Sequence, residues 1–209
     1  YQKSGWDGSH NSTIIHQILT HGIINKAKQV NSSCAGLTEY PLLREEIPPN
    51  EMSVEAFHQL SEEIPHVNIY NFTKILDLRE YSRREKTPAE RIRLIKSAIS
   101  NGDRVTLGVI LTTLDGSGAY GKFNKNLDAW VITPEVISAM HTHDFGGHAM
   151  VITGYDDKAI ATDIHGNQHQ GLFKLRNSWG TDAGDEGNFY MSYEYMANLA
   201  YDLIRVRHN

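Results

Sequence analysis

The chain has 209 residues, of which 40% are hydrophobic and 22% are charged, as is ordinary for a globular protein with a sizeable core. Its net charge of −5 implies no broad attraction to nucleic acid or to an anionic membrane surface, so neither is expected as a partner. No apolar run approaches the length needed to cross a bilayer, and the single cysteine, Cys34, excludes an internal disulfide.

The amino-terminal part of the chain predicts two helices. The first runs to His21, can be capped by Asn11 or Ser12, and can end at Gly22. Its apolar face would consist of Ile14, Ile15, Ile18 and Leu19. The second helix is expected from Ser53 to Glu63. The surrounding residues 42–87 are rich in Glu, Arg and Pro, and we interpret them as a charged insertion.

A clear helix start follows at Thr87. Thr87 suits the N-cap, Pro88 suits the first helical position, and Glu90 completes a capping box. This helix is expected to end at Asn101, where an Asn-Gly pair follows the last apolar position. The segment Val105–Leu111 is apolar on both faces, which predicts a central strand.

The last third of the chain predicts several strands. A strand from His148 to Thr153 should end at the turn signal Gly154–Asp157, and Ala159–Ile164 should then close a hairpin. A third strand, Leu172–Asn177, alternates faces. It places Phe173, Leu175 and Asn177 on one side, and Leu172, Lys174 and Arg176 on the other.

Three glycines indicate a loop that returns to the sheet. Gly180, Gly184 and Gly187 precede an expected strand at Asn188–Tyr193. The segment Leu199–Val206 is expected to be the closing strand.

Antiparallel strands of this kind can bring His148 beside Asn177. The amide oxygen of Asn177 can accept a hydrogen bond from one ring N–H of His148, which fixes the tautomer and turns the other ring nitrogen toward a nucleophile. Because the amide carries no charge, another group must stabilise the imidazolium, and a thiolate suits that role. The indole of Trp179 could cover the Asn–His bond and exclude water from it.

These motifs resemble those of the papain-like cysteine peptidases. The matching segments are Gly147-His148-Ala149 with Gly154-Tyr155-Asp156, then Asn177-Ser178-Trp179-Gly180, then Gly184-Asp185-Glu186-Gly187-Asn188-Phe189-Tyr190. The resemblance implies that His148 is the general base and acid, that Asn177 orients it, and that Trp179 and Gly147 support the pair. Ala183 stands where the family usually has a second Trp. Because the chain has no internal disulfide, it is more similar to a bacterial branch of this family than to the eukaryotic members.

The resemblance also implies a nucleophilic cysteine that heads a long apolar helix, with a glutamine shortly before it. Cys34 fits this pattern poorly, because Pro41 would stop a helix almost at once and Gln29 stands five positions before the cysteine. We therefore expect Cys34 to be a small buried or loop residue. We also expect this chain to be the C-terminal part of a longer polypeptide, with the nucleophile in a missing N-terminal segment or in a separate light-chain-like polypeptide.

Other readings remain open. The chain could be a non-catalytic relative that binds a peptide or a partner, or a thioester-using transferase or deamidase on the same fold. His141, His143, Asp144 and His148 could instead form a metal cluster, because His-x-His is common in such sites. The better match of His148 to the peptidase motif argues against metal.

The resemblance implies an α+β fold with two domains and an active site in the cleft between them. Residues 1–87 are expected to form the remainder of a helical domain, and residues 88–209 a β-rich, barrel-like domain with the catalytic His and Asn. The expected partner is a peptide or protein substrate, and no cofactor is expected.

Overall fold

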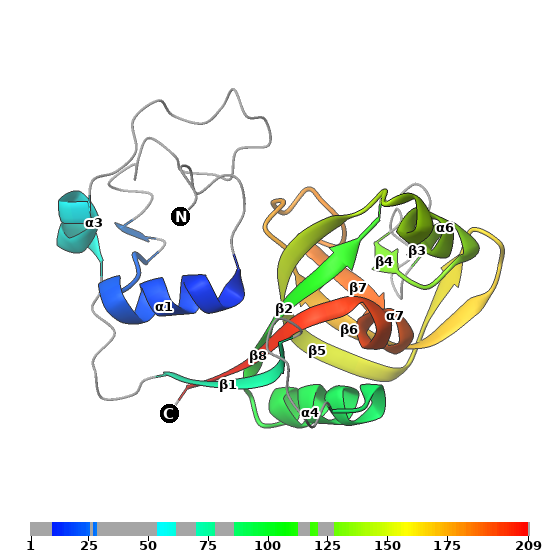
Figure 1. Ribbon diagram of the computed structural model, residues 1–209, viewed down its shortest axis with the longest axis horizontal. Coiled ribbons are helices and arrows are strands. Elements are labelled where there is room, and N and C mark those ends of the chain that lie inside the picture. Colours follow the sequence, from blue (N-terminus) through cyan, green and yellow to red (C-terminus); the bar gives the residue numbers. More distant parts are fainter. Residues whose placement is uncertain are drawn as a thin grey trace. The chain divides into compact units, whose positions relative to one another are not determined.

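The fold is described from a computed structural model of the chain (Figure 1). The structure describes residues 10–25, 27–28, 54–61, 70–77, 86–112, 118–120 and 128–208. Cys34, Gln29 and most of the expected insertion at 42–87 lie outside these residues.

The described helices and strands divide between two compact units, Tyr1–Ile69 with Asn209 and Tyr70–His208. In chain order they are α1 (Asn11–His21), α3 (Val54–Leu60), β1 (Tyr70–Asp77), α4 (Pro88–Ser100), β2 (Arg104–Leu111), β3 (Gly118–Tyr120), β4 (Ala129–Trp130), α6 (Pro134–Thr142), β5 (Gly146–Asp163), β6 (Gln168–Arg176), β7 (Asn188–Ser192), α7 (Tyr193–Leu199) and β8 (Ala200–His208).

The first unit contains the two predicted amino-terminal helices. Helix α1 ends at His21 as expected, because Gly22 has the positive φ of 81° that a helix terminus favours. Its start differs from the expectation, since His10 is the N-cap and makes no side-chain capping bond. His21 Nδ1 lies 2.8 Å from Nε2 of His58 in α3, and the two rings stack.

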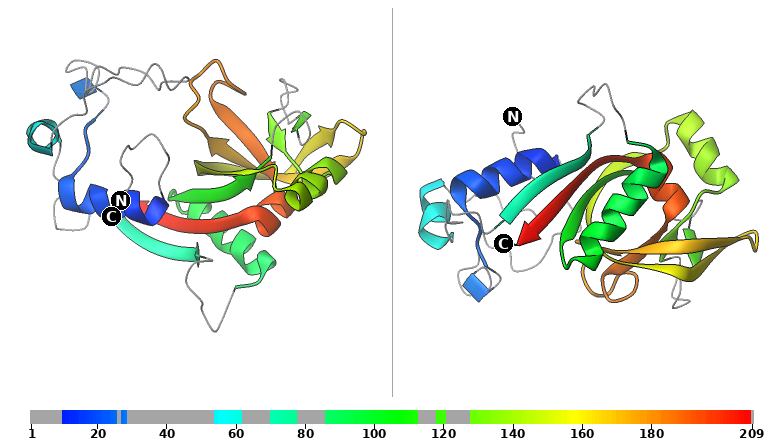
Figure 2. Two further views of the ribbon diagram at one scale, coloured as in Figure 1. Left: turned by 45° about the horizontal axis from the view of Figure 1, so that its top comes forward. Right: turned by 90° about the horizontal axis from the view of Figure 1, so that it is seen from below.

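The described part of the second unit is built on an eight-stranded sheet in the order β1-β8-β2-β5-β3-β4-β7-β6. Strand β6 also pairs with β5. The five strands β5, β3, β4, β7 and β6 therefore form a closed ring. All of these pairings are antiparallel except β4 with β7. Figure 2 shows β1, β8 and β2 side by side as a curved layer. The result is the expected α+β, barrel-like arrangement.

The core of this unit lies between the sheet and helices α4 and α7. Ile95 and Ala98 of α4 are buried, and so is Tyr195 of α7. The predicted capping box is present, because Thr87 Oγ1 accepts from Glu90 N and Glu90 accepts from Thr87 N. Strand β2 is central, between β8 and β5, as its apolar faces predicted.

One predicted element was wrong. The expected hairpin at 148–164 is a single 18-residue strand, β5. Asp156 Oδ1 does accept bonds from the N–H groups of Lys158 and Ala159, as in a turn. The pairing with β6 absorbs this irregularity as a shift in register between Asp156 and Ile160, so the strand continues. The real turn comes later, at 164–167.

Candidate active site

The centre of the candidate site is the contact between His148 and Asn177. His148 Nε2 lies 2.9 Å from Asn177 Oδ1. Strand register produces this contact: β5 pairs Val151 with Arg176, the last residue of β6, which brings Asn177 alongside the start of β5. His148 is half-buried and Asn177 is 7% exposed, so the bond is largely shielded. With Nε2 engaged, Nδ1 is the ring nitrogen left for another group.

Asn177 is held by the loop that the three glycines predicted. Its Oδ1 also accepts from Ser178 N at 2.8 Å, and its own N–H donates to Gly187 O at 3.1 Å. Gly187 has φ 80°, and a Cβ there would stand 2.8 Å from Gly180 O. The close backbone approach therefore requires glycine at this position.

Trp179 lies against the imidazole. The ring centroids of Trp179 and His148 are 5.0 Å apart with an interplanar angle of 34°. Trp179 also packs edge to face against Phe189 and Trp130, with ring centroids 5.4 and 6.3 Å away, respectively. These buried rings fix the indole, so that it lies against the His148 ring. Ala183, in place of a Trp, packs half-buried against the same core.

Gly147 lies beside Tyr201, a residue that the sequence gave no reason to connect with the site. A Cβ on Gly147 would stand 3.1 Å from the Tyr201 hydroxyl, and one on Gly108 would stand 2.8 Å from the Tyr201 ring. Tyr201 falls where the pairing of β8 with β2 shifts register. The two glycines therefore leave room for a tyrosine ring next to the strand that carries His148.

A cavity of about 590 Å³ opens beside His148. It is lined by Leu111, Thr112, Trp130, His143, Asp144, Phe145, Gly146, Gly147, His148 and Trp179, all from the second unit. This size is within the range of cavities that bind small ligands or side chains. The wall formed by Phe145 and Asp144 was missed at the level of sequence as part of a binding surface, although both residues stand just before the His strand.

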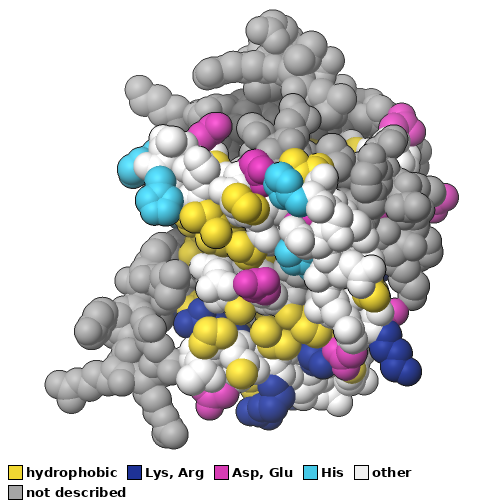
Figure 3. Space-filling model, turned by 90° about the vertical axis from the view of Figure 1, so that its right-hand side faces the viewer, with side chains coloured by type: hydrophobic (Ala, Val, Ile, Leu, Met, Phe, Trp, Pro, Cys, Tyr) yellow, Lys and Arg dark blue, Asp and Glu magenta, His cyan; other side chains and the backbone are white. Residues whose placement is uncertain are grey.

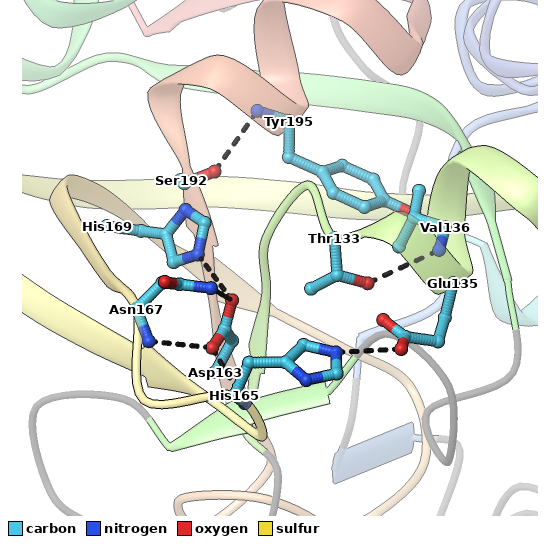
Figure 4. Close-up of polar contacts among 9 residues, drawn as sticks. All are labelled: Thr133, Glu135, Val136, Asp163, His165, Asn167, His169, Ser192 and Tyr195. Atoms are coloured by element: carbon cyan, nitrogen blue, oxygen red, sulfur yellow. Dashed lines mark hydrogen bonds and ion pairs between the residues drawn. The ribbon is translucent and has the colours of Figure 1, made fainter.

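The start of α6, the end of the helix away from this wall, takes part in a polar network (Figure 4). Thr133 caps α6, and Glu135 in its first turn lies 2.7 Å from His165 Nε2 in the β5–β6 turn. That turn is organised by buried Asp163, which accepts from the backbone N–H groups of His165 and Asn167 and from the Asn167 side chain.

Burial disfavours ionisation of Asp163 and would raise its pKa. The hydrogen bonds from the Asn167 side chain, the His169 ring and the two backbone N–H groups outweigh that effect, and they lower the pKa to about 2. Asp163 is therefore a carboxylate throughout the neutral range. Its hydrogen bonds hold the turn between β5 and β6 together.

The alternative of a metal cluster at His141, His143, Asp144 and His148 receives no support from side-chain placement. Across the described ranges, no three or more His, Cys, Asp or Glu side chains are grouped so as to hold a metal ion. His141 instead contacts Ile137 O of its own helix, and His143 stacks on Phe145.

The described part of the chain contains no helix long and apolar enough to span a membrane.

Comparison with known sequences identifies relatives of the segment that carries this site. Residues 138–209 match the model of the Peptidase C1-like family. An uncharacterized peptidase C1-like protein of Acanthamoeba polyphaga mimivirus is 25% identical over 146 residues, which are 66% of this chain and 40% of that protein. Aminopeptidase C of Lactococcus lactis is 40% identical over 57 residues, which are 27% of this chain and 12% of that enzyme. The chain thus corresponds to less than half of either relative.

Comparison of structures supports the fold. Xylellain, a cysteine protease from Xylella fastidiosa, aligns with 97% of this chain and 63% of its own, at a TM-score of 0.51 and 16% identity. At that identity the likeness concerns the fold alone, and it confirms the predicted papain-like α+β class. The segment that matches the Peptidase C1-like family, residues 138–209, is the one that carries both His148 and Asn177.

Proposed function

We propose that this chain supplies the histidine and asparagine of a cysteine peptidase, whose nucleophilic thiol comes from outside the described residues. The observation that carries the proposal is the 2.9 Å contact between His148 Nε2 and Asn177 Oδ1 under Trp179. This contact leaves Nδ1 of His148 available, and His148 lines an open cavity, where a thiol can approach.

The chemistry follows from that arrangement. The thiol transfers its proton to His148 Nδ1 and becomes a thiolate, which attacks the carbonyl carbon of a peptide bond. His148 then gives the proton to the departing amine, and a thioester remains. Water attacks the thioester while His148 takes one of its protons. Collapse releases the carboxylic acid and returns the proton to the sulfur. Asn177 keeps the ring in the orientation that both transfers need.

Two substitutions test these roles in the natural polypeptide that contains this chain. His148→Ala should lower kcat/KM for a peptide substrate by about 10³-fold or more, because it removes the proton carrier. Asn177→Ala should lower it less, by about 10- to 100-fold, because it disturbs only the orientation of the ring. His141→Ala is the matched control: this exposed histidine does not line the cavity, and its loss should leave kcat/KM unchanged.

The outcome also separates the alternatives. Full activity of His148→Ala would contradict the proposal. Peptide binding without turnover in the unsubstituted protein would favour a non-catalytic binding protein, and transfer of the acyl group to an added amine would favour a transferase. Cys34→Ser should retain activity, and its complete inactivation would instead make Cys34 the nucleophile.

A further inference from the structure

The cavity beside His148 has a wall that the proposed chemistry does not use. His143, Asp144 and Phe145 join the end of α6 to the start of β5 and line the cavity. Most of the lining is apolar or aromatic, with Leu111 and Trp130 beside Phe145 and Trp179. Among the described residues that line the cavity, Asp144 is the only one with a carboxylate. Figure 3 shows one face of the molecule, on which apolar, histidine, acidic and basic side chains are mixed.

The position of Asp144 is set by its backbone. His143, at φ 60°, ends helix α6 in a left-handed conformation, and Asp144 N donates to Ala139 O at 3.0 Å. The Asp144 side chain itself is exposed, and within the described ranges no hydrogen bond or ion pair engages its carboxylate. An acidic group is therefore held at the cavity without a cation to match it.

Phe145 provides the adjoining apolar surface. Its side chain is 38% exposed, although it stacks on His143 with ring centroids 6.1 Å apart. A long basic side chain matches such a surface, because its methylene stem packs on apolar walls while its charged end seeks a carboxylate. Aromatic rings close to the cation add to that attraction.

We propose that this cavity binds a lysine or arginine side chain of the peptide held beside His148, with Asp144 as the residue that selects the positive charge. The stem would contact Phe145, and the ammonium or guanidinium group would pair with the Asp144 carboxylate. This proposal rests on the proposed function, because it assigns the substrate class of the same site. A neutral aliphatic side chain would contact only the apolar wall, and an acidic side chain would be repelled by the Asp144 carboxylate.

Binding to the chain of 209 residues tests the proposal without any need for turnover. Two of its three tryptophans, Trp130 and Trp179, line the cavity, so quenching of tryptophan fluorescence reports occupancy. Three peptides that differ only in one side chain are titrated: lysine, norleucine and glutamate. The lysine peptide should bind about fivefold or more tightly than the norleucine peptide, because a partly exposed ion pair with cation–π support is worth about 1 kcal/mol. The glutamate peptide should bind weakest.

Two variants with the same change of charge locate the effect. Asp144→Asn should bring the lysine and norleucine peptides to within about twofold of each other, since only the ion pair is lost. Asp182→Asn removes an exposed carboxylate that does not line the cavity, and it should leave the fivefold preference intact. Phe145→Ala should weaken the lysine and norleucine peptides together, because both use the apolar wall.

Three results would overturn the proposal: equal binding of the lysine and norleucine peptides, a preference that survives Asp144→Asn, or no binding of the lysine peptide at millimolar concentration. These results are distinct from a failure of the proposed function. If His148→Ala left turnover intact while the lysine preference followed Asp144, the peptidase assignment would fail and the recognition of a basic side chain would stand.

Discussion

At the scale of single residues, the position of Asn177 depends on glycines that allow two backbone segments to approach closely. Gly187 O accepts the bond from Asn177 N, and a Cβ on Gly187 would also stand 3.1 Å from the Arg176 guanidinium. The sequence indicated a loop from the glycine spacing. It could not indicate that the loop backbone itself holds the amide that faces His148, because that contact depends on how the loop folds back.

A matched pair of substitutions separates the two reasons for a glycine at position 187, its positive φ and the close approach of the Gly180 carbonyl. Gly166 has a similar φ of 83°, but a Cβ there meets nothing within 4 Å. Gly166→Ala should therefore cost only the left-handed backbone penalty, about 1 kcal/mol of unfolding free energy. Gly187→Ala should cost about 1–2 kcal/mol more, because its Cβ crowds Gly180 O and the loop must shift. Chemical denaturation of both variants measures the difference.

The same pair has a functional readout. A shift of the loop moves the carbonyl that holds Asn177, so Gly187→Ala should also lower kcat/KM of the natural polypeptide, and Gly166→Ala should not. Equal losses of stability and activity in the two variants would show that the close approach at Gly187 has no part in placing Asn177.

At the scale of elements, sequence signals predicted local structure, such as helix caps, better than they predicted where a strand continues without a turn. The capping box at Thr87 and Glu90 was correct because its bonds are formed within one turn. The turn expected at 154–157 was wrong because distant groups hold β5 in place there. Asp157 Oδ1 lies 2.6 Å from Lys96 Nζ of α4 and accepts from the Tyr193 hydroxyl of α7 at 2.6 Å. Such partners are far away in the sequence, so no local pattern shows them.

The true turn after β5 gives a prediction about acid stability. The pKa of Asp163 is lowered to about 2, below the ~3.9 of an unfolded chain, so its carboxylate stabilises the folded state above about pH 4. This contribution is lost as the pH falls from about 4 through 2. Asp163→Ala should lower the unfolding free energy at pH 7 by on the order of 2–3 kcal/mol, because bonds to a charged acceptor disappear.

The pH dependence of that loss identifies its origin. The difference in unfolding free energy between the unsubstituted protein and Asp163→Ala should be full at pH 7 and smaller at pH 3. Urea denaturation at both values measures it. If the difference were the same at the two values, the ionised carboxylate would not be what stabilises the turn.

At the scale of the whole molecule, the proposed site belongs to one unit of the chain. His148, Asn177, Trp179 and the cavity wall all lie within Tyr70–His208. The sequence placed the domain boundary after residue 87, where the charged insertion was thought to end. The structure includes β1 in the second unit, because β1 pairs with β8 from Tyr70↔His208 to Asp77↔Asp202. A strand that pairs with the far end of the chain cannot be assigned from its neighbours in sequence.

Two shortened chains test which boundary describes the folding unit. Residues 70–208 should unfold in one cooperative urea transition. Residues 88–208 lack β1, and with it the buried side chains of Ile75 and Leu76 and the pairing that covers the edge of β8. The loss of two buried aliphatic side chains should lower the unfolding free energy by about 3–5 kcal/mol. Substituting Ile75→Ala and Leu76→Ala in the longer chain should reproduce most of that loss while leaving the backbone of β1 in place. Equal stability of the two shortened chains would instead support the boundary at residue 87 and would make β1 an attachment to a unit that is complete without it.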